Sequence, residues 1–163
     1  MTTPTSATWS LRPAINDRAR GCDCVRGWLR DHNRRTNPRF MELLERPEHE
    51  RRPLTILAWS GEEVVGGIFA DTQLKWLRID LMAVAPERRN QGVGTGLLKA
   101  AEEEAVARGC QYAFVDTMDY QAPRFYLAHG FEVVGRVADW DSDGHEKLYF
   151  CKSLRARTSS EAS

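Results

Sequence analysis

Cysteine is scarce in this chain, and its positions follow no pattern that a metal site or a disulfide framework requires. The four cysteines are Cys22, Cys24, Cys110 and Cys151, and only the first two are close in sequence. A closed zinc site needs four ligands, and no second pair of cysteines or histidines follows Cys24 at a suitable spacing. We therefore expect free thiols and no bound metal.

Long apolar runs and a net charge are also missing. No window approaches the roughly 20 apolar residues of a membrane-spanning helix, and Met1–Ser10 has neither the basic start nor the apolar stretch of a secretory signal. Lysine and arginine together number 23, as do aspartate and glutamate. Arginines gather between Arg12 and Arg52, but few aromatic residues lie among them. We expect a cytoplasmic protein that binds neither nucleic acid nor a membrane.

The chain has the length and composition of a single globular domain. Its 163 residues are 42% hydrophobic and 28% charged, which is typical of a soluble globular protein with one hydrophobic core. We predict one domain over residues 1–163, with its core between about 7 and 154 and a mobile tail at 155–163.

Apolar periodicity predicts the order of the elements. Two helices, from Asp17 to about His32 and from Pro38 until the charged segment at Arg46, are expected to follow a weak strand at Ala7–Pro13. The β-type runs Leu54–Trp59 and Val64–Ala70 predict a hairpin. The remaining expected elements are a strand at Trp76–Val84, a helix beginning near Val93, a strand at Tyr112–Asp116, a helix capped by Asp119 with Pro123 in its first turn, and strands at Glu132–Val137 and His145–Leu154.

Simple alternation along the strand 76–84 predicts which side chains share a face. The expected faces are Ile79, Leu81 and Ala83 on one side, and Arg78, Asp80, Met82 and Val84 on the other. With the glycine turn, the helix and the next strand, this strand forms a unit typical of parallel strand pairing.

A glycine-rich turn joins the strand 76–84 to the helix at Val93. The turn contains Arg88, Arg89, Gly92, Gly94 and Gly96. Free amides at a helix N-terminus bind anions, and glycine lets a phosphate approach the backbone closely. A turn that needs glycine only for its tight geometry would have the same composition. The turn alone therefore does not distinguish an anion site from a purely structural turn.

Two nucleotide-binding loops are excluded by spacing. A Walker loop needs a Gly-Lys pair after four intervening residues, whereas Lys99 lies deep in the predicted helix. The dinucleotide fingerprint needs a third small residue where Leu97 stands. Neither a nucleoside triphosphate nor a nicotinamide dinucleotide is favoured.

The chain resembles the GCN5-related N-acetyltransferases over about residues 54–154. The segment Arg89–Gly94 matches every fixed position of the phosphate turn of that family, and Ala122, Tyr126, Gly130 and Phe131 reproduce a second family pattern downstream. The resemblance implies a single α/β domain with a mixed, mostly antiparallel sheet of six to seven strands and about four helices. It also implies that the sheet is splayed at a central parallel pair, where acetyl-CoA binds.

The resemblance further implies the cofactor-binding and catalytic residues. Amides of the turn Gln91–Thr95 would hold the CoA pyrophosphate, and the strand near Met82 would hydrogen-bond the pantetheine arm and polarise the thioester carbonyl. Tyr126 would donate a hydrogen bond or a proton to the departing sulfur. The full set of expected cofactor-binding residues is Met82, Ala83, Val84, Arg88, Arg89, Asn90, Gln91, Gly92, Val93, Gly94, Thr95 and Tyr126.

The reaction also needs a base, because an alkylamine with a pKa near 10 is protonated at neutral pH. Asp80 is the first candidate, since alternation places it on the face of Met82 and Val84. Asp116 and Asp119 form a second pair of candidates, and each of these carboxylates has a plain structural reading as a cap or an ion-pair partner. His129 and His145 are weaker candidates.

The expected acceptor is a primary amine of a small molecule, either a metabolite or an amine-bearing antibiotic. Members of the family that acetylate peptide N-termini carry a different pattern where Val115–Asp119 stands here, which argues against a peptide N-terminus. Acetylation of a protein lysine or N-terminus, and a non-catalytic acyl-CoA-binding module, remain as alternatives. The resemblance also implies a homodimer.

Overall fold

A computed structural model describes residues 11, 13 and 18–155 of the chain. The chain divides by its contacts into two compact units, residues 1–43 and 44–163. The expected strand at Ala7–Pro13 and the tail at 155–163 lie almost entirely outside the described residues, and the assignment of a single domain to the whole chain stays a prediction.

The N-terminal unit contains the two helices that periodicity predicts, α1 (Arg18–Thr36) and α2 (Pro38–Leu44). Between them, the Thr36 hydroxyl donates to the His32 carbonyl at 3.0 Å, and the Asn37 side chain accepts the Phe40 amide at 3.1 Å. Asn37 thus satisfies an amide at the start of α2 that has no partner within the helix. None of the residues of α1, all of which are described, is buried.

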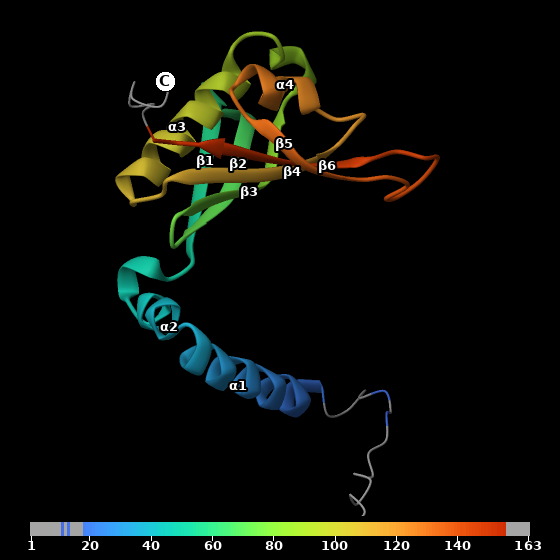
Figure 1. The fold of residues 1–163 in the computed structure, drawn as a ribbon. Coiled ribbons are helices and arrows are strands. Elements are labelled where there is room, and N and C mark those ends of the chain that lie inside the picture. The colour runs from blue at the N-terminus through green and yellow to red at the C-terminus, as the bar shows by residue number, and fades with distance from the viewer. Residues whose placement is uncertain (1–10, 12, 14–17, 156–163) are drawn as a thin grey trace, which may run out of the picture. The chain divides into compact units, whose positions relative to one another are not determined.

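A six-stranded sheet forms the second unit, in the order β1-β2-β3-β4-β6-β5 (Figure 1). Its strands are β1 (Arg52–Ser60), β2 (Glu63–Gln73), β3 (Trp76–Val84), β4 (Tyr112–Met118), β5 (Glu132–Val137) and β6 (Lys147–Ser153). Among the described strands, β3 and β4 alone pair in parallel, and the other pairings are antiparallel. The expected mixed, mostly antiparallel α/β sheet, with its first hairpin, is therefore confirmed.

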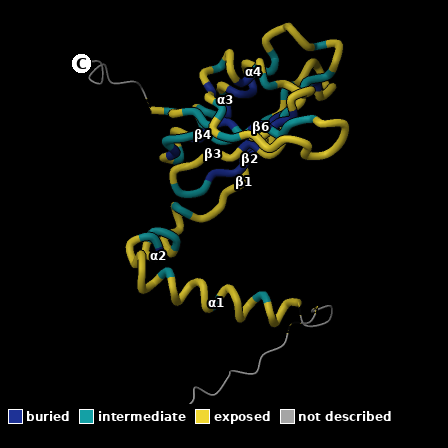
Figure 2. Tube along the Cα trace, turned by 45° about the vertical axis from the view of Figure 1, so that its right-hand side comes forward, coloured by how far each residue is buried: buried dark blue, intermediate teal, exposed yellow. Residues whose placement is uncertain are grey.

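Two helices of this unit, α3 (Val93–Ala107) and α4 (Pro123–Ala128), cover one face of the sheet (Figure 1). Two short 3-10 helices, η1 (Pro47–His49) and η2 (Pro86–Arg88), precede β1 and follow β3. The helical spacing of α3 turns Leu97, Leu98, Ala101 and Ala105 into the core, where they meet fully buried side chains such as Ile68, Leu77, Phe131 and Phe150. Figure 2 shows these buried positions concentrated along the strands and the inner side of the helices.

The parallel pair is short, and this opens the sheet. Trp76–Ile79 of β3 pairs with Tyr112–Val115 of β4, and beyond these residues both strands continue without pairing to each other. On its other side β4 stays paired to β6 as far as Met118. The expected splay at the central pair is confirmed, and it lies at the ends of β3 and β4 that lead to the two helices.

A β-bulge at Asp80 changes which side chains of β3 share a face. Ala70 pairs with Ile79 but Phe69 pairs with Leu81, so Asp80 is an extra residue. A bulge reverses the alternation of everything that follows it. Beyond the bulge Met82 pairs with the fully buried Ile68, whereas Leu81 is 58% exposed. The predicted faces were therefore wrong beyond Ile79, because Met82 and Val84, rather than Leu81 and Ala83, pack against the core.

The start of α4 also differs from the prediction. Pro123 does lie in its first turn and Gly130 ends it with a φ of 81°, but the residue before the helix is Ala122, which provides no side-chain cap. Asp119 instead accepts hydrogen bonds from His145 Nδ1 at 2.9 Å and from the Glu146 amide at 3.3 Å. The prediction that Asp119 caps α4 was wrong, because its carboxylate instead bonds the segment that precedes β6.

Neither a membrane span nor a metal cluster is found in the described part of the chain. None of its helices combines the length and apolarity that a bilayer crossing requires. Among the same residues, no three side chains of histidine, cysteine, aspartate or glutamate are grouped so that they could hold a metal ion.

Candidate active site

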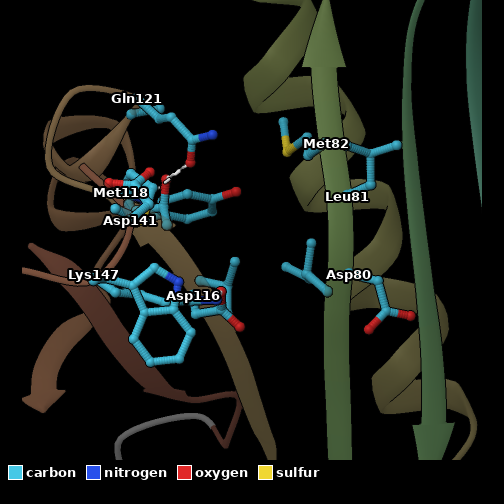
Figure 3. A pocket seen from close by; sticks show the side chains of 14 residues that line it. Asp80, Leu81, Met82, Asp116, Met118, Gln121, Asp141 and Lys147 are labelled. Carbon is cyan, nitrogen blue, oxygen red and sulfur yellow. Dashed lines mark hydrogen bonds and ion pairs between the residues drawn. The ribbon is translucent and has the colours of Figure 1, made fainter. Parts of the chain in front are cut away.

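Two pockets open at the splay between β3 and β4, and they share a wall. The first has a volume of about 640 Å³ and borders the glycine turn. The second has a volume of about 450 Å³ and lies between the ends of the two strands (Figure 3). Met82, Gln121, Ala122 and Tyr126 line both. A molecule in one pocket therefore meets a molecule in the other at Met82 and Tyr126.

The glycine turn of the first pocket has the backbone conformation that an anion site needs. Asn90 and Gly92 have φ values of 59° and 83°, in the left-handed region that glycine adopts at little cost. The Gly96 amide donates the first helical bond, to the Gly92 carbonyl at 2.9 Å. The amides that precede it in the first turn have no acceptor within the helix, so they and the positive end of the helix dipole are available to a phosphate.

Two arginines border the same pocket. Arg88 donates to the Ser60 hydroxyl at 3.2 Å, and Nε of Arg89 donates to the Val84 carbonyl at 3.2 Å. Both guanidinium groups are thus held beside the turn, where they add charge-assisted donors for an anion.

Most of the expected cofactor-binding residues meet at this pocket. Those that line it are Met82, Ala83, Val84, Arg88, Arg89, Asn90, Gly92, Gly94, Thr95 and Tyr126. Two others belong to the turn without lining the pocket. The Gln91 side chain donates to the Glu87 carbonyl at 2.8 Å, and the Val93 side chain packs against the core.

The backbone of β3 offers a second kind of binding surface. Beyond Ile79, the edge of β3 that faces β4 has no partner among the described strands. Met82, Ala83 and Val84 on this stretch line the first pocket. Free amides and carbonyls at a strand edge bind an extended ligand as a neighbouring strand would.

Tyr126 stands between the two pockets with a buried phenol ring. The residue is 6% exposed, and its ring centroid lies 5.5 Å from that of Phe131 and 5.9 Å from that of Phe150. Burial, and to a lesser extent the charge of Asp116, raises the pKa of Tyr126 to about 12. The phenol is therefore protonated at neutral pH and can donate a hydrogen bond.

Charged side chains from β4 and β6 line the second pocket. Nζ of Lys147 lies 2.6 Å from Oδ1 of Asp116 (Figure 3) and 4.6 Å from the ring centroid of Trp140. The hydrogen bond to Asp116 raises the pKa of Lys147. Asp141, also on the pocket wall, accepts the Tyr120 hydroxyl at 2.9 Å, and this bond lowers the pKa of Asp141. Both carboxylates are thus held in hydrogen bonds.

The other expected acid–base groups either point away from the second pocket or lie outside both pockets. Asp80 borders the pocket, but its carboxylate points away from Asp116 and Lys147 (Figure 3) and lies 3.8 Å from the Arg51 guanidinium. Asp119 and His145 pair with each other at 2.9 Å and line neither pocket. His129 contacts the Thr95 hydroxyl at 3.0 Å and the Phe125 carbonyl at 2.8 Å.

Sequence reasoning missed four residues of the second pocket: Gln121, Trp140, Asp141 and Lys147. Gln121 accepts hydrogen bonds from the Thr117 hydroxyl and the Met118 amide, at 2.8 and 2.9 Å. The pairing of Met118 with Lys147 between β4 and β6 brings the other three to the splay. For Trp140 and Asp141, the only signal of a pocket in the sequence was the acidic segment 139–146. Such a segment is equally typical of an ordinary turn.

A six-stranded sheet that is splayed at its parallel pair, followed by a glycine turn at the start of α3, is accompanied by a match to a known family of enzymes. The chain belongs to the acetyltransferase (GNAT) family, whose model matches residues 17–131. It is an enzyme of the acyltransferase class.

Three relatives illustrate this membership. The chain is 38% identical over 96 residues to acetyltransferase Atu2258 of Agrobacterium fabrum, a match that covers 58% of this chain and 70% of the relative. It is 34% identical over 117 residues to the blasticidin-S acetyltransferase of Streptomyces morookaense, covering 69% and 86%. A crystal structure of an acetyltransferase from Bacillus cereus superposes with a TM-score of 0.70 at 25% identity, covering 88% of this chain and 97% of that one.

Proposed function

We propose that this enzyme transfers the acetyl group of acetyl-CoA directly to a primary amine of a small molecule, a metabolite or an amine-bearing antibiotic. The observation that carries the proposal is the meeting of two pockets at Tyr126 and Met82. One pocket presents an anion-binding turn, and the other presents carboxylates.

Acetyl-CoA occupies the first pocket in this proposal. Its pyrophosphate accepts hydrogen bonds from amides of the turn Gln91–Thr95 and from Arg88 and Arg89. Its pantetheine arm lies along the free edge of β3, and a backbone amide near Met82 or Ala83 polarises the thioester carbonyl.

The neutral amine nitrogen attacks the acetyl carbon, and the carbon–sulfur bond then breaks to release the CoA thiolate. The nitrogen loses its second proton to solvent water as the amide forms. Tyr126 donates a hydrogen bond to the departing sulfur. A thiol with a pKa near 8.5 is a stronger acid than a phenol with a pKa of about 12, so full proton transfer from Tyr126 is uphill by roughly 5 kcal/mol. Stabilisation of the thiolate by a retained phenol proton is therefore the favoured role.

The ammonium proton of the acceptor must leave before attack. We assign this step to Asp80. Because its carboxylate faces away from the pocket (Figure 3), a water molecule carries the proton to it. The Asp116 carboxylate faces the pocket but is held by Lys147 at 2.6 Å. Loss of the acidic limb of the pH–rate profile in Asp80→Asn, but not in Asp116→Asn, is the expected result.

A small acceptor suits the second pocket. Its volume of about 450 Å³ lies in the usual range for small-molecule sites, and a relative at 34% identity is named for acetylating blasticidin S. The proposal includes a cytoplasmic homodimer that needs no metal, nucleic acid or membrane as a partner. Light scattering during gel filtration tests the dimer.

Thermal denaturation and thiol release together test the function. Acetyl-CoA should raise the melting temperature, because a ligand of the native state stabilises it. A panel of small amines should then release free CoA thiol, with the acetylated amine identified by mass spectrometry. Stabilisation by acetyl-CoA with no thiol release from any amine would leave a non-catalytic acyl-CoA-binding module, and release with peptides alone would make the acceptor a protein.

A further inference from the structure

The second pocket is lined by an aromatic residue and by the carboxylate residue that follows it in sequence, on the loop between β5 and β6. Trp140 and Asp141 both line the pocket, and Trp140 is 49% exposed. Their contacts place them in the pocket wall, where they are available to a bound acceptor.

The loop that carries this pair is fastened at several points. The Trp140 amide donates to the His145 carbonyl at 3.0 Å, and the Lys147 ammonium lies over the Trp140 ring. The Tyr120 hydroxyl and the Ser142 amide each donate to Asp141, at 2.9 and 2.6 Å. Trp140 and Asp141 are thereby oriented before any acceptor binds.

The Asp141 carboxylate also has no cation partner among the described residues, and its oxygens can accept further hydrogen bonds. Asp116 pairs with Lys147, and Asp80 lies near Arg51. No ion pair joins Asp141 to a cation among the described residues. Each of its oxygens accepts one of the two hydrogen bonds above, and an ionised carboxylate accepts about four in all. Asp141 is therefore the carboxylate of this pocket that is open to a cation of the acceptor.

We propose that the acceptor carries, besides its reacting amine, a planar delocalised cation of the guanidinium class, which lies on Trp140 and pairs with Asp141. A guanidinium group stacks on an aromatic ring and presents a fork of donors to a carboxylate, whereas an ammonium group is a compact point charge. The amine then extends toward Tyr126, which lines the same pocket. This inference rests on the proposed function, because it names the acceptor of the same site.

Three amines of matched length test the inference with acetyl-CoA and the full-length protein. They are 4-aminobutylguanidine, its neutral planar analogue 4-aminobutylurea, and 1,4-diaminobutane, which has a second cation without the plane. We expect kcat/KM for the guanidine to exceed that for the urea by about 10-fold or more, mainly through KM, since one charge-assisted contact is worth at least that factor. Equal values for the guanidine and the urea would overturn the inference.

Substitutions test whether Asp141 and Trp140 cause the preference for the guanidine over the urea. Asp141→Asn should reduce the guanidine-to-urea ratio of kcat/KM to near one, while the amide can still accept from Tyr120. Trp140→Leu should lower kcat/KM for both planar amines more than for the diamine. Asp143→Asn, an exposed position in the same loop that does not line the pocket, is the control and should keep the wild-type ratio. Because the ratio is measured within one protein, a partly unfolded variant does not change it. An undiminished ratio in Asp141→Asn would overturn the inference.

A binding experiment separates this inference from the proposed function. Butylguanidine has no reacting amine, and calorimetry with the CoA-bound protein should show binding that butylurea does not show and that Asp141→Asn weakens about 10-fold or more. If no amine releases thiol but this binding is seen, the proposed function fails and the guanidinium site stands. If amines are acetylated but butylguanidine and butylurea bind equally, the guanidinium site fails and the proposed function stands.

Discussion

Lys147 and Asp116 form a close ion pair, with 2.6 Å between Nζ and Oδ1, in the wall of the second pocket. The two residues come from adjacent strands, β6 and β4, and meet only because the sheet pairs them there. The pair keeps the Asp116 carboxylate occupied, so this pocket has no unpaired carboxylate at that position.

Removal of the lysine should therefore change the pH dependence of the reaction. In Lys147→Met the unpaired Asp116 carboxylate favours the protonated form of a nearby amine and raises the pKa of that amine. The acidic limb of kcat, which reports groups in the bound complex, should then move to higher pH. Lys99→Met, on the exposed side of α3 where Lys99 pairs with Glu103 at 3.7 Å, should leave the profile in place. A shift to lower pH in Lys147→Met would contradict this assignment of the pair.

Tyr126→Phe should reduce turnover and leave cofactor binding nearly intact. The ring contacts with Phe131 and Phe150 are kept, but the donor to the departing sulfur is lost, for which about a 10²-fold decrease in kcat is expected. Calorimetry should give a CoA affinity within a few-fold of the wild type. Tyr112→Phe, a tyrosine of β4 that lines neither pocket, is the matched control. An unchanged kcat would remove Tyr126 from the mechanism.

The buried phenol also predicts how stability depends on pH. Because Tyr126 ionises near pH 12 in the folded protein and near 10 when unfolded, the unfolded chain holds fewer protons between these values. The free energy of unfolding should therefore fall as the pH rises from 10 to 12, by up to about 2.7 kcal/mol from this residue. Denaturant unfolding should show a smaller fall in Tyr126→Phe. Identical pH dependence in both proteins would show that the phenol is not shielded.

Gly92, which precedes α3, and Gly96, which lies within it, give opposite predictions. Gly92→Ala places a side chain at a φ of 83°, which costs about 1–2 kcal/mol, and reorientation of the turn should raise the KM for acetyl-CoA about 10-fold or more. At Gly96 an added Cβ meets no atom within 4 Å. Gly96→Ala should stabilise the helix by about 0.4–1 kcal/mol and leave that KM unchanged. Equal effects of the two substitutions on KM would argue against an anion site at the turn.

Most residues of the first pocket were predictable from sequence because its geometry is local. Arg88, Arg89 and the glycines from Gly92 to Gly96 lie close together in one strand–turn–helix unit, so their spacing already indicates where their amides lie. Tyr126 was found through a second pattern at a fixed distance along the chain. The order and type of the strands followed from periodicity for the same reason.

The second pocket was less predictable, because its lining depends on the register between strands that are distant in sequence. The bulge at Asp80 arises from the pairing of β3 with β2, and it reverses the faces that simple alternation predicts. Lys147, Trp140 and Asp141 reach the pocket only because β6 pairs with β4. A sequence without strand registers contains neither piece of information.

Thiol release with acetyl-CoA and a panel of small amines, followed by mass spectrometry of the products, tests the central claim most directly. We predict CoA release in equal amount to an acetylated small amine, greatly reduced in Tyr126→Phe. Binding of acetyl-CoA without thiol release from any amine of the panel would contradict the claim that this enzyme acetylates small amines.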